Sequence, residues 1–129
     1  MESNNYNESF ENLEAWKVAR ELRKKVSKLV KSFPDIEKYR LTDQLTRSSR
    51  SITANIAEGY GRFHYLENIH HCYMSRGSVM ETLDHLICAN DEGYIDTNLL
   101  EEYKNHIFGL MKILNGYIAY LKKQNNNNK

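Results

Sequence analysis

Residues 41–62 read LTDQLTRSSRSITANIAEGYGR, and this segment predicts a packed helix more clearly than any other part of the chain. Its apolar or small side chains recur at steps of three and four residues. They are Leu41, Leu45, Ser48, Ile52, Ile56 and Gly59. This spacing places them on one face of an α-helix that packs against a core. Gly59 and Gly61 are expected to end the helix, because glycine is common at helix C-termini.

Polar side chains beside that stripe predict a second feature of the same helix. They are Gln44, Arg47, Ser51, Asn55, Glu58 and Arg62. Polar groups that become buried need hydrogen-bond partners, so we expect a polar line of contact with a neighbouring helix. The motif made by Gln44, Ser51, Asn55, Glu58 and Gly59 is therefore predicted to be structural and not catalytic.

The rest of the chain predicts an all-α, antiparallel, up-down-up-down four-helix bundle. The length of 129 residues fits one domain with a substantial core. Short connections between the helices favour antiparallel neighbours. We expect the bundle domain to cover residues 9–123, with polar, disordered tails at residues 1–8 and 124–129.

Local signals set the expected ends of the other helices. Ser9 is expected to cap the first helix, and Pro34 falls where the helical pattern of that segment ends. The second helix is expected to run from about residue 36 to residue 60. The third follows residue 64, and Asp96 or Thr97 is expected to cap the fourth.

The apolar stripes of these three helices follow the same spacing. The first helix offers Trp16, Ala19, Leu22, Val26, Leu29 and Phe33. The third offers Leu66, Ile69, Tyr73, Met80, Leu83 and Ile87, and the fourth offers Leu100, Tyr103, Ile107, Leu110, Leu114, Tyr117 and Leu121. Glycine inside a helix is unfavourable by about 1 kcal/mol relative to alanine, so Gly77 is expected at a close helix contact.

Additional apolar residues widen two of the stripes. Val18 and Val30 flank the stripe of the first helix, and Leu99, Met111 and Ile118 flank that of the fourth. Because a monomer rarely exposes such a wide apolar face, we expect the protein to bind copies of itself as a homo-oligomer. The alternative is that these residues enlarge the core of a monomer.

The amino-acid composition limits the cellular compartments and the kinds of binding partner that we expect for this protein. A net charge of +1 does not mark the whole molecule as a polyanion binder. Cys72 and Cys88, the two cysteines, would lie roughly 24 Å apart on one helix, beyond disulfide reach. Reduced thiols and a cytoplasmic location are therefore expected. Without a signal-peptide pattern or an apolar run of about 20 residues, no membrane partner is expected.

The charge is nevertheless uneven along the chain. Residues 10–33 carry seven basic and three acidic side chains, and residues 36–62 carry five and three. Residues 63–92 carry one basic and five acidic side chains. This asymmetry predicts a basic face on the first two helices.

Clustered cations on that face are candidate contacts for nucleic-acid phosphates. The candidates are Arg20, Arg23, Lys24, Lys28, Lys31, Arg47, Arg50 and Arg62. The alternative is a solvated outer face without a ligand. In that case Arg47 would pair with Asp43, four residues earlier on the helix. Arg62 would pair with Glu58 in the same way.

No metal site, cofactor or catalytic centre is expected. Glu81, His85 and Cys88 share a helix face, but di-metal bundles draw their ligands from several helices. The adjacent His70 and His71 point about 100° apart, which makes a shared site difficult. The serines lack the local base and orienting group that nucleophilic catalysis requires. A non-enzymatic role is therefore expected.

Several segments carry a resemblance to a known family. They are LEAWKVA at residues 13–19, FP at 33–34, the segment 41–62 with its SITANIAEG, GSVME at 77–81 and GYI at 93–95. On these motifs, residues 10–121 resemble the 23S rRNA intervening-sequence proteins, a bacterial family of four-helix bundles. Two positions depart from the pattern: Thr53 stands in place of a proline, and Arg50 in place of an apolar residue.

The resemblance implies a non-enzymatic homo-oligomer, a homopentamer by analogy. A related branch of accessory proteins from diversity-generating retroelements is pentameric and binds nucleic acid and a reverse transcriptase. RNA or DNA and a reverse transcriptase are thus the partners that the resemblance implies. The resulting hypothesis is a nucleic-acid-associated accessory protein. The alternative is a protein-interaction or scaffold bundle with no nucleic-acid role.

Overall fold

The structure, a computed structural model, describes residues 9–128. Four α-helices make up the bundle: α1 (Glu14–Leu29), α2 (Leu41–Tyr60), α3 (Tyr65–Asp91) and α4 (Thr97–Asn127). Three short 3-10 turns accompany them: η2 (Phe10–Asn12), η3 (Val30–Ser32) and η4 (Asp35–Glu37). Residues 9–128 contain no β-strand, and the predicted all-α four-helix bundle is confirmed.

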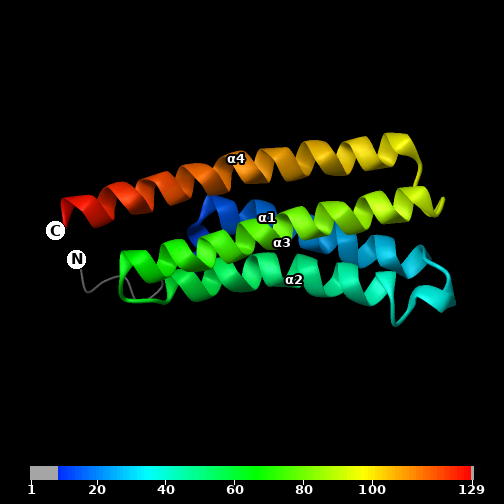
Figure 1. Cartoon of the computed structure of the whole chain (residues 1–129), viewed down its shortest axis with the longest axis horizontal. Helices are drawn as coiled ribbons and strands as arrows, with labels where there is room; N and C mark the ends of the chain where they lie inside the picture. Colours follow the sequence, from blue (N-terminus) through cyan, green and yellow to red (C-terminus); the bar gives the residue numbers. More distant parts are fainter. Residues whose placement is uncertain (1–8, 129) are drawn as a thin grey trace.

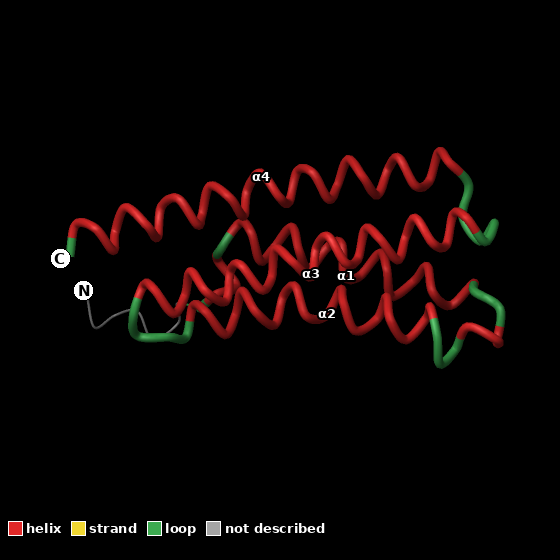
Figure 2. The backbone as a smooth tube through the Cα atoms, in the orientation of Figure 1, coloured by secondary structure: helices red, strands yellow, loops and turns green. Residues whose placement is uncertain are grey.

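Each helix packs against two others. α1 and α3 both contact α2 and α4. Figure 1 shows the α2–α3 connection at the same end of the bundle as the C-terminus, with the other two connections at the opposite end. Figure 2 shows the loops that join the helices at these two ends. The chain therefore reverses direction at every connection, and neighbours in sequence are neighbours in space.

The core runs along the bundle between the four helices. All six positions of the stripe predicted for residues 41–62 are buried. The largest fully buried side chains include Leu22 and Val26 of α1, Ile52 and Ile56 of α2, Val79 and Leu86 of α3, and Ile107, Leu110 and Leu114 of α4. Burying one such side chain contributes about 1.5–3 kcal/mol, so this column is the main stabilising feature of the fold.

The first two helices begin later than expected. Ser9 caps η2, where its Oγ accepts the N–H of Glu11 at 3.1 Å, and α1 begins only at Glu14. The second helix begins at Leu41 and not at residue 36. The reason is Arg40, whose φ of −125° and ψ of −109° lie outside the helical region.

The fourth helix is longer than expected. Asp96 caps it, because its Oδ1 accepts the N–H of Leu99 at 2.8 Å. The helix continues to Asn127, past residue 124 where we expected the tail to begin. At its end, Nδ2 of Asn128 donates to the carbonyl oxygen of Gln124 at 2.8 Å and satisfies one of the last carbonyl groups. The tail predicted at residues 1–8 lies outside the described residues.

No helix within residues 9–128 has both the length and the apolar character needed to span a membrane.

Two glycines have roles that differ from the predictions. Gly59 does not end α2 but lies buried within it, and Gly61 is the capping residue, with a φ of −76°. Gly77 is exposed, and a Cβ there would meet no atom within 4 Å. The close helix contact expected at Gly77 is therefore absent, and Gly59 makes one instead.

The face that α3 buries also differs from the prediction. Ile69 is buried and Leu83 packs against the core, as expected. However, Leu66, Tyr73, Met80 and Ile87 are exposed by 62%, 38%, 39% and 37%. The buried positions are Asn68, Ile69, Cys72, Ser75, Val79, Thr82, Leu86 and Ala89. The helix is thus turned so that mainly small and polar residues face the core.

The extra apolar residues of α1 and α4 enlarge the core of the single chain. Ile118 is buried, and Val18, Val30, Leu99 and Met111 pack against the core. The prediction that these residues form an exposed apolar face is therefore wrong. The structure places such a face on α3.

Candidate functional site

Side-chain hydrogen bonds join α2 and α3 along a half-buried line. Nδ2 of Asn55 donates to the carbonyl oxygen and to Oγ of Ser51, at 3.0 and 3.1 Å. Oδ1 of Asn55 lies 3.3 Å from Nδ1 of His71 on α3. Oγ of Ser78, also on α3, donates to Oγ of Ser51 at 2.9 Å. Ser51 and Asn55 therefore make the inter-helix contacts that the sequence led us to expect.

Deeper between the same helices lie three buried hydroxyl groups. Oγ of Ser75 donates to the carbonyl oxygen of Ile52 at 2.8 Å, and the hydroxyls of Ser48 and Thr82 are 2.8 Å apart. Ser75 and Thr82 are not among the residues predicted to form the polar line of contact. Their signal is a repeat of seven residues on α3, which places Asn68, Ser75, Thr82 and Ala89 at equivalent positions. These small and polar residues let α3 approach α2 closely.

A groove of about 510 Å³ lies between α1 and α2. Its lining consists of Phe10, Trp16, Arg23, Arg50, Thr53, Ala54 and Ala57. We call this feature the α1–α2 groove. Arg50 and Thr53, the two positions at which the resemblance implies other residues, both line it.

The arginines of the groove are held by specific contacts. Nη1 of Arg23 donates to Oγ1 of Thr53 at 3.0 Å, and this hydroxyl donates to the carbonyl oxygen of Arg50 at 3.2 Å. The guanidinium of Arg20 lies over the Trp16 ring, with Cζ 5.6 Å from the ring centroid. Two of the predicted cations, Arg23 and Arg50, thus line the groove, and a third, Arg20, lies beside it over the Trp16 ring.

The other predicted cations lie apart from this groove. Lys24, Lys28 and Lys31 are exposed along α1, and Lys24 is 3.9 Å from a carboxylate oxygen of Glu21. Nε of Arg47 donates to Oδ2 of Asp43 at 2.9 Å. Arg47 therefore makes the ion pair that the alternative interpretation required.

Arg62 likewise pairs with acidic residues. Its Nη2 donates to Oε2 of Glu58 at 2.6 Å, and its Nη1 lies 3.8 Å from Oε1 of Glu67. Glu58 is exposed, as is Gln44, so these two residues of the predicted motif do not share the half-buried contacts of Ser51 and Asn55.

An apolar line runs along the outside of α3. Leu66, Tyr73, Met80 and Ile87 are exposed and follow one another at intervals of seven residues. We call these four residues the outer α3 stripe. Side chains at this interval remain on one face of a helix, and in coiled coils they contact a second helix.

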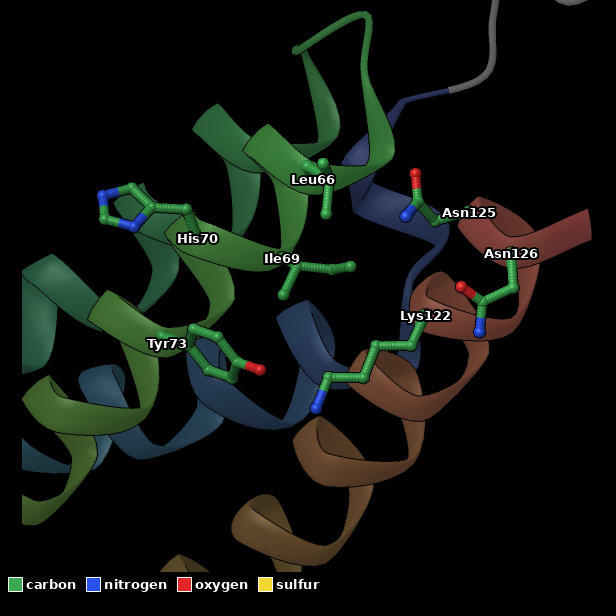
Figure 3. A pocket seen from close by; sticks show the side chains of 7 residues that line it. All are labelled: Leu66, Ile69, His70, Tyr73, Lys122, Asn125 and Asn126. Carbon is green, nitrogen blue, oxygen red and sulfur yellow. The ribbon is translucent and has the colours of Figure 1, made fainter. Parts of the chain in front are cut away.

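A cavity of about 400 Å³ adjoins one end of this stripe (Figure 3). Leu66, Ile69, His70 and Tyr73 line it from α3, and Lys122, Asn125 and Asn126 line it from α4. Lys122 extends toward Tyr73, with Nζ 5.6 Å from the ring centroid. The guanidinium of Arg76 lies 4.9 Å from the same centroid, so Tyr73 carries two cation–π contacts.

The histidines and cysteines do not gather at one point. Among residues 9–128, no three histidine, cysteine or acidic side chains are placed to hold a metal ion. Nε2 of His85 lies 3.2 Å from Oε2 of Glu81. Both cysteines are free; Cys72 is buried, which raises its pKa to about 11, and Cys88 is exposed.

The fold and its motifs match a known family. The family model of the 23S rRNA-intervening sequence protein matches residues 11–116, which contain α1, α2, α3 and the first part of α4. No curated protein sequence matches the chain. The chain belongs to the 23S rRNA-intervening sequence protein family.

Proposed function

We propose that this protein is a non-enzymatic, homo-oligomeric accessory protein that binds nucleic acid through a basic face of α1 and α2. The observation that carries the proposal is the placement of Arg23 and Arg50 in the lining of the α1–α2 groove, with Arg20 beside it over the Trp16 ring. In the described part of the chain, none of the three forms an ion pair with a carboxylate. Their charges are therefore available to phosphates.

Three exposed lysines extend this basic face along α1. Lys24, Lys28 and Lys31 add charge without a buried role. Residues 63–92, most of which belong to α3, carry five acidic side chains and one basic one, and this excess offsets much of the positive charge of the first two helices. Exposed charges farther apart than about 10 Å are largely screened at 0.1 M salt, so the local charge determines phosphate binding.

The outer α3 stripe supports the homo-oligomeric part of the proposal. An apolar line at seven-residue intervals matches the surface that one helix presents to another in a coiled coil. A second copy of the chain would cover Leu66, Tyr73, Met80 and Ile87. Five copies around one axis is the arrangement that the family resemblance implies, and a reverse transcriptase partner stays a prediction from that resemblance alone.

Binding to labelled RNA and DNA at about 50 mM and 200 mM salt tests the nucleic-acid role. We expect affinity to fall steeply with salt, because phosphate contacts release counterions. A variant with Lys24, Lys28 and Lys31 changed to glutamine should reduce the slope of the log–log salt plot by about 0.7–0.9 for each phosphate that it no longer neutralises. In the matched control variant, three lysines of α4 are changed to glutamine: Lys112, Lys122 and Lys123. This variant should have the same log–log salt slope as the wild type.

The second candidate function is a protein-interaction or scaffold bundle. The outer α3 stripe favours it, since an apolar face binds protein better than phosphate. No RNA or DNA binding at either salt concentration would overturn the nucleic-acid role and leave this candidate.

A further inference from the structure

We infer that the α1–α2 groove holds one nucleotide of a single-stranded nucleic acid, with its phosphate at Arg23 and Arg50 and its base against Trp16 and Phe10. The inference rests on the proposed function and names the form of nucleic acid and the site. Duplexes, free phosphate and acidic peptides are then poorer ligands for this groove.

The groove has the two-sided chemistry of a nucleotide site. The groove is wide open to solvent and has a volume of about 510 Å³, so a nucleotide would lie along it with one side exposed. Arg23, Arg50 and Thr53 make one part of its lining polar, and the rest consists of two aromatic rings and the side chains of Ala54 and Ala57. A nucleotide likewise combines a charged group with a flat apolar ring.

Arg23 is oriented before any ligand arrives. Its Nη1 donates to Oγ1 of Thr53 at 3.0 Å, and Thr53 is only 4% exposed. A guanidinium group has five N–H donors, so this bond leaves others for an anion. Its planar fork matches the oxygens of a phosphate. Arg50, exposed at the same groove, supplies a second cation.

The aromatic part of the groove is suited to a base. Phe10 and Trp16 meet edge to face, with ring centroids 5.0 Å apart, and Arg20 stacks on Trp16. Bases of single strands stack on aromatic rings and on arginine planes. In a duplex the bases are already stacked and paired, so only the phosphates would be available. The aromatic rings therefore favour a single strand.

The only tryptophan of the chain lies in the groove and reports on it directly. We would titrate the full chain with a single-stranded oligonucleotide and follow Trp16 fluorescence, with fluorescence anisotropy of a labelled oligonucleotide as a second readout. We expect saturable quenching at the concentrations where anisotropy rises. Inorganic phosphate, a duplex of the same sequence and polyglutamate at equal charge should each produce little quenching.

Three variants assign the effect to the groove. Arg50→Gln removes an exposed cation and should weaken single-strand binding about tenfold, as expected for a charged hydrogen bond. Thr53→Val removes the hydroxyl that orients Arg23 and should weaken binding by a smaller factor. Arg47→Gln is the matched control on the same helix, because Arg47 pairs with Asp43 outside the groove, and should change affinity less than twofold. Circular dichroism checks that each variant is folded.

The other possible outcomes distinguish a failure of this inference from a failure of the proposed function. If anisotropy shows binding but Trp16 fluorescence is unchanged and Arg50→Gln behaves like Arg47→Gln, the inference is wrong and the proposed function stands. Equal quenching by the duplex overturns the single-strand preference. Equal quenching by polyglutamate identifies an acidic-peptide site instead. If no nucleic acid binds at low salt, the proposed function fails and the inference fails with it.

Discussion

A Cβ atom on Gly59 would lie 2.6 Å from Oδ1 of Asn68, so the end of α2 meets the start of α3 at a distance that only glycine permits. The same Cβ would lie 2.9 Å from Cβ of His71. Asn68 is buried, and its Nδ2 donates to Oη of Tyr117 on α4 at 3.1 Å. Gly59 therefore allows α2 to approach the side chain that connects α3 with α4.

Gly59→Ala is expected to lower the free energy of unfolding. The added methyl group must displace Asn68 or shift a helix, which costs about 1–3 kcal/mol. The higher helix propensity of alanine offsets about 1 kcal/mol of that cost. Urea unfolding followed by circular dichroism measures the change. Gly77→Ala is the matched control, since the site is exposed and open, and should gain up to about 1 kcal/mol. Equal gains at both positions would contradict the close approach at Gly59.

We expect the hydroxyls of Ser48 and Thr82 to make coupled contributions to the free energy of unfolding. Thr82→Val leaves the buried Ser48 hydroxyl with only the carbonyl oxygen of Leu45, at 3.4 Å, and should cost about 1–3 kcal/mol. Ser48→Ala should cost less, because Thr82 still donates to the carbonyl oxygen of Ser78 at 2.8 Å.

The variant that combines both changes should be less destabilised than the sum of the single changes, by about 1 kcal/mol. A double-mutant cycle from urea unfolding gives this coupling energy. Strict additivity would show that the two hydroxyls act separately.

The sequence predicts the fold class and the stripe of α2 because the most apolar line of that helix is also its buried line. On α3 the two lines differ. Leu66, Tyr73, Met80 and Ile87 form an apolar line that is exposed, whereas Ile69, Val79 and Leu86 are buried together with Ser75 and Thr82. Hydrophobic periodicity detects a helix face but does not show whether that face turns toward the core or away from it. The short distance to α2 selects small residues for the buried side.

The sequence predicted which kinds of residue make up the candidate site, but not how these residues are arranged in space. The charge pattern placed cations on the first two helices, and spacing at i,i+4 identified the acidic partners of Arg47 and Arg62. The link from Arg23 to Thr53 joins residues 30 positions apart and depends on how α1 lies against α2. Local patterns carry no information on such a contact, so the α1–α2 groove emerges only from the fold.

The two cysteines are expected to differ in reactivity. Cys88 is exposed, and Cys72 is fully buried. A thiol reagent should therefore label one thiol in the folded protein and two in guanidinium chloride. Partial desolvation and then the charges of Glu92 and Asp91 raise the pKa of Cys88, so its labelling should accelerate as the pH rises through 9 and above. Cys88→Ser should remove the fast phase, and two fast thiols in the wild type would contradict the burial of Cys72.

The raised pKa of the buried Cys72 thiol predicts a loss of stability at high pH. Its folded pKa of about 11 exceeds the ordinary value of 9.0, so the folded state holds the proton more tightly than the unfolded state. Its contribution is complete below pH 9 and is lost as the pH rises to 11. Urea unfolding at several pH values should show a smaller decline for Cys72→Ala than for the wild type across this window. Parallel declines would exclude Cys72 as the cause.

Introducing charge into the outer α3 stripe is expected to break the proposed homo-oligomer without unfolding the chain. Met80 and Ile87 are 39% and 37% exposed in the single chain and do not belong to the buried core, so Met80→Lys and Ile87→Lys leave the core residues in place. In an oligomer each lysine would be buried against an apolar partner, which is strongly unfavourable. Size exclusion with light scattering should give a multiple of 15.2 kDa for the wild type and 15.2 kDa for the variants.

Ile36→Lys, at a site 64% exposed on η4, is the control and should keep the wild-type mass. A wild-type mass of 15.2 kDa across micromolar concentrations would refute the oligomer, and a mass about five times larger would support the pentamer.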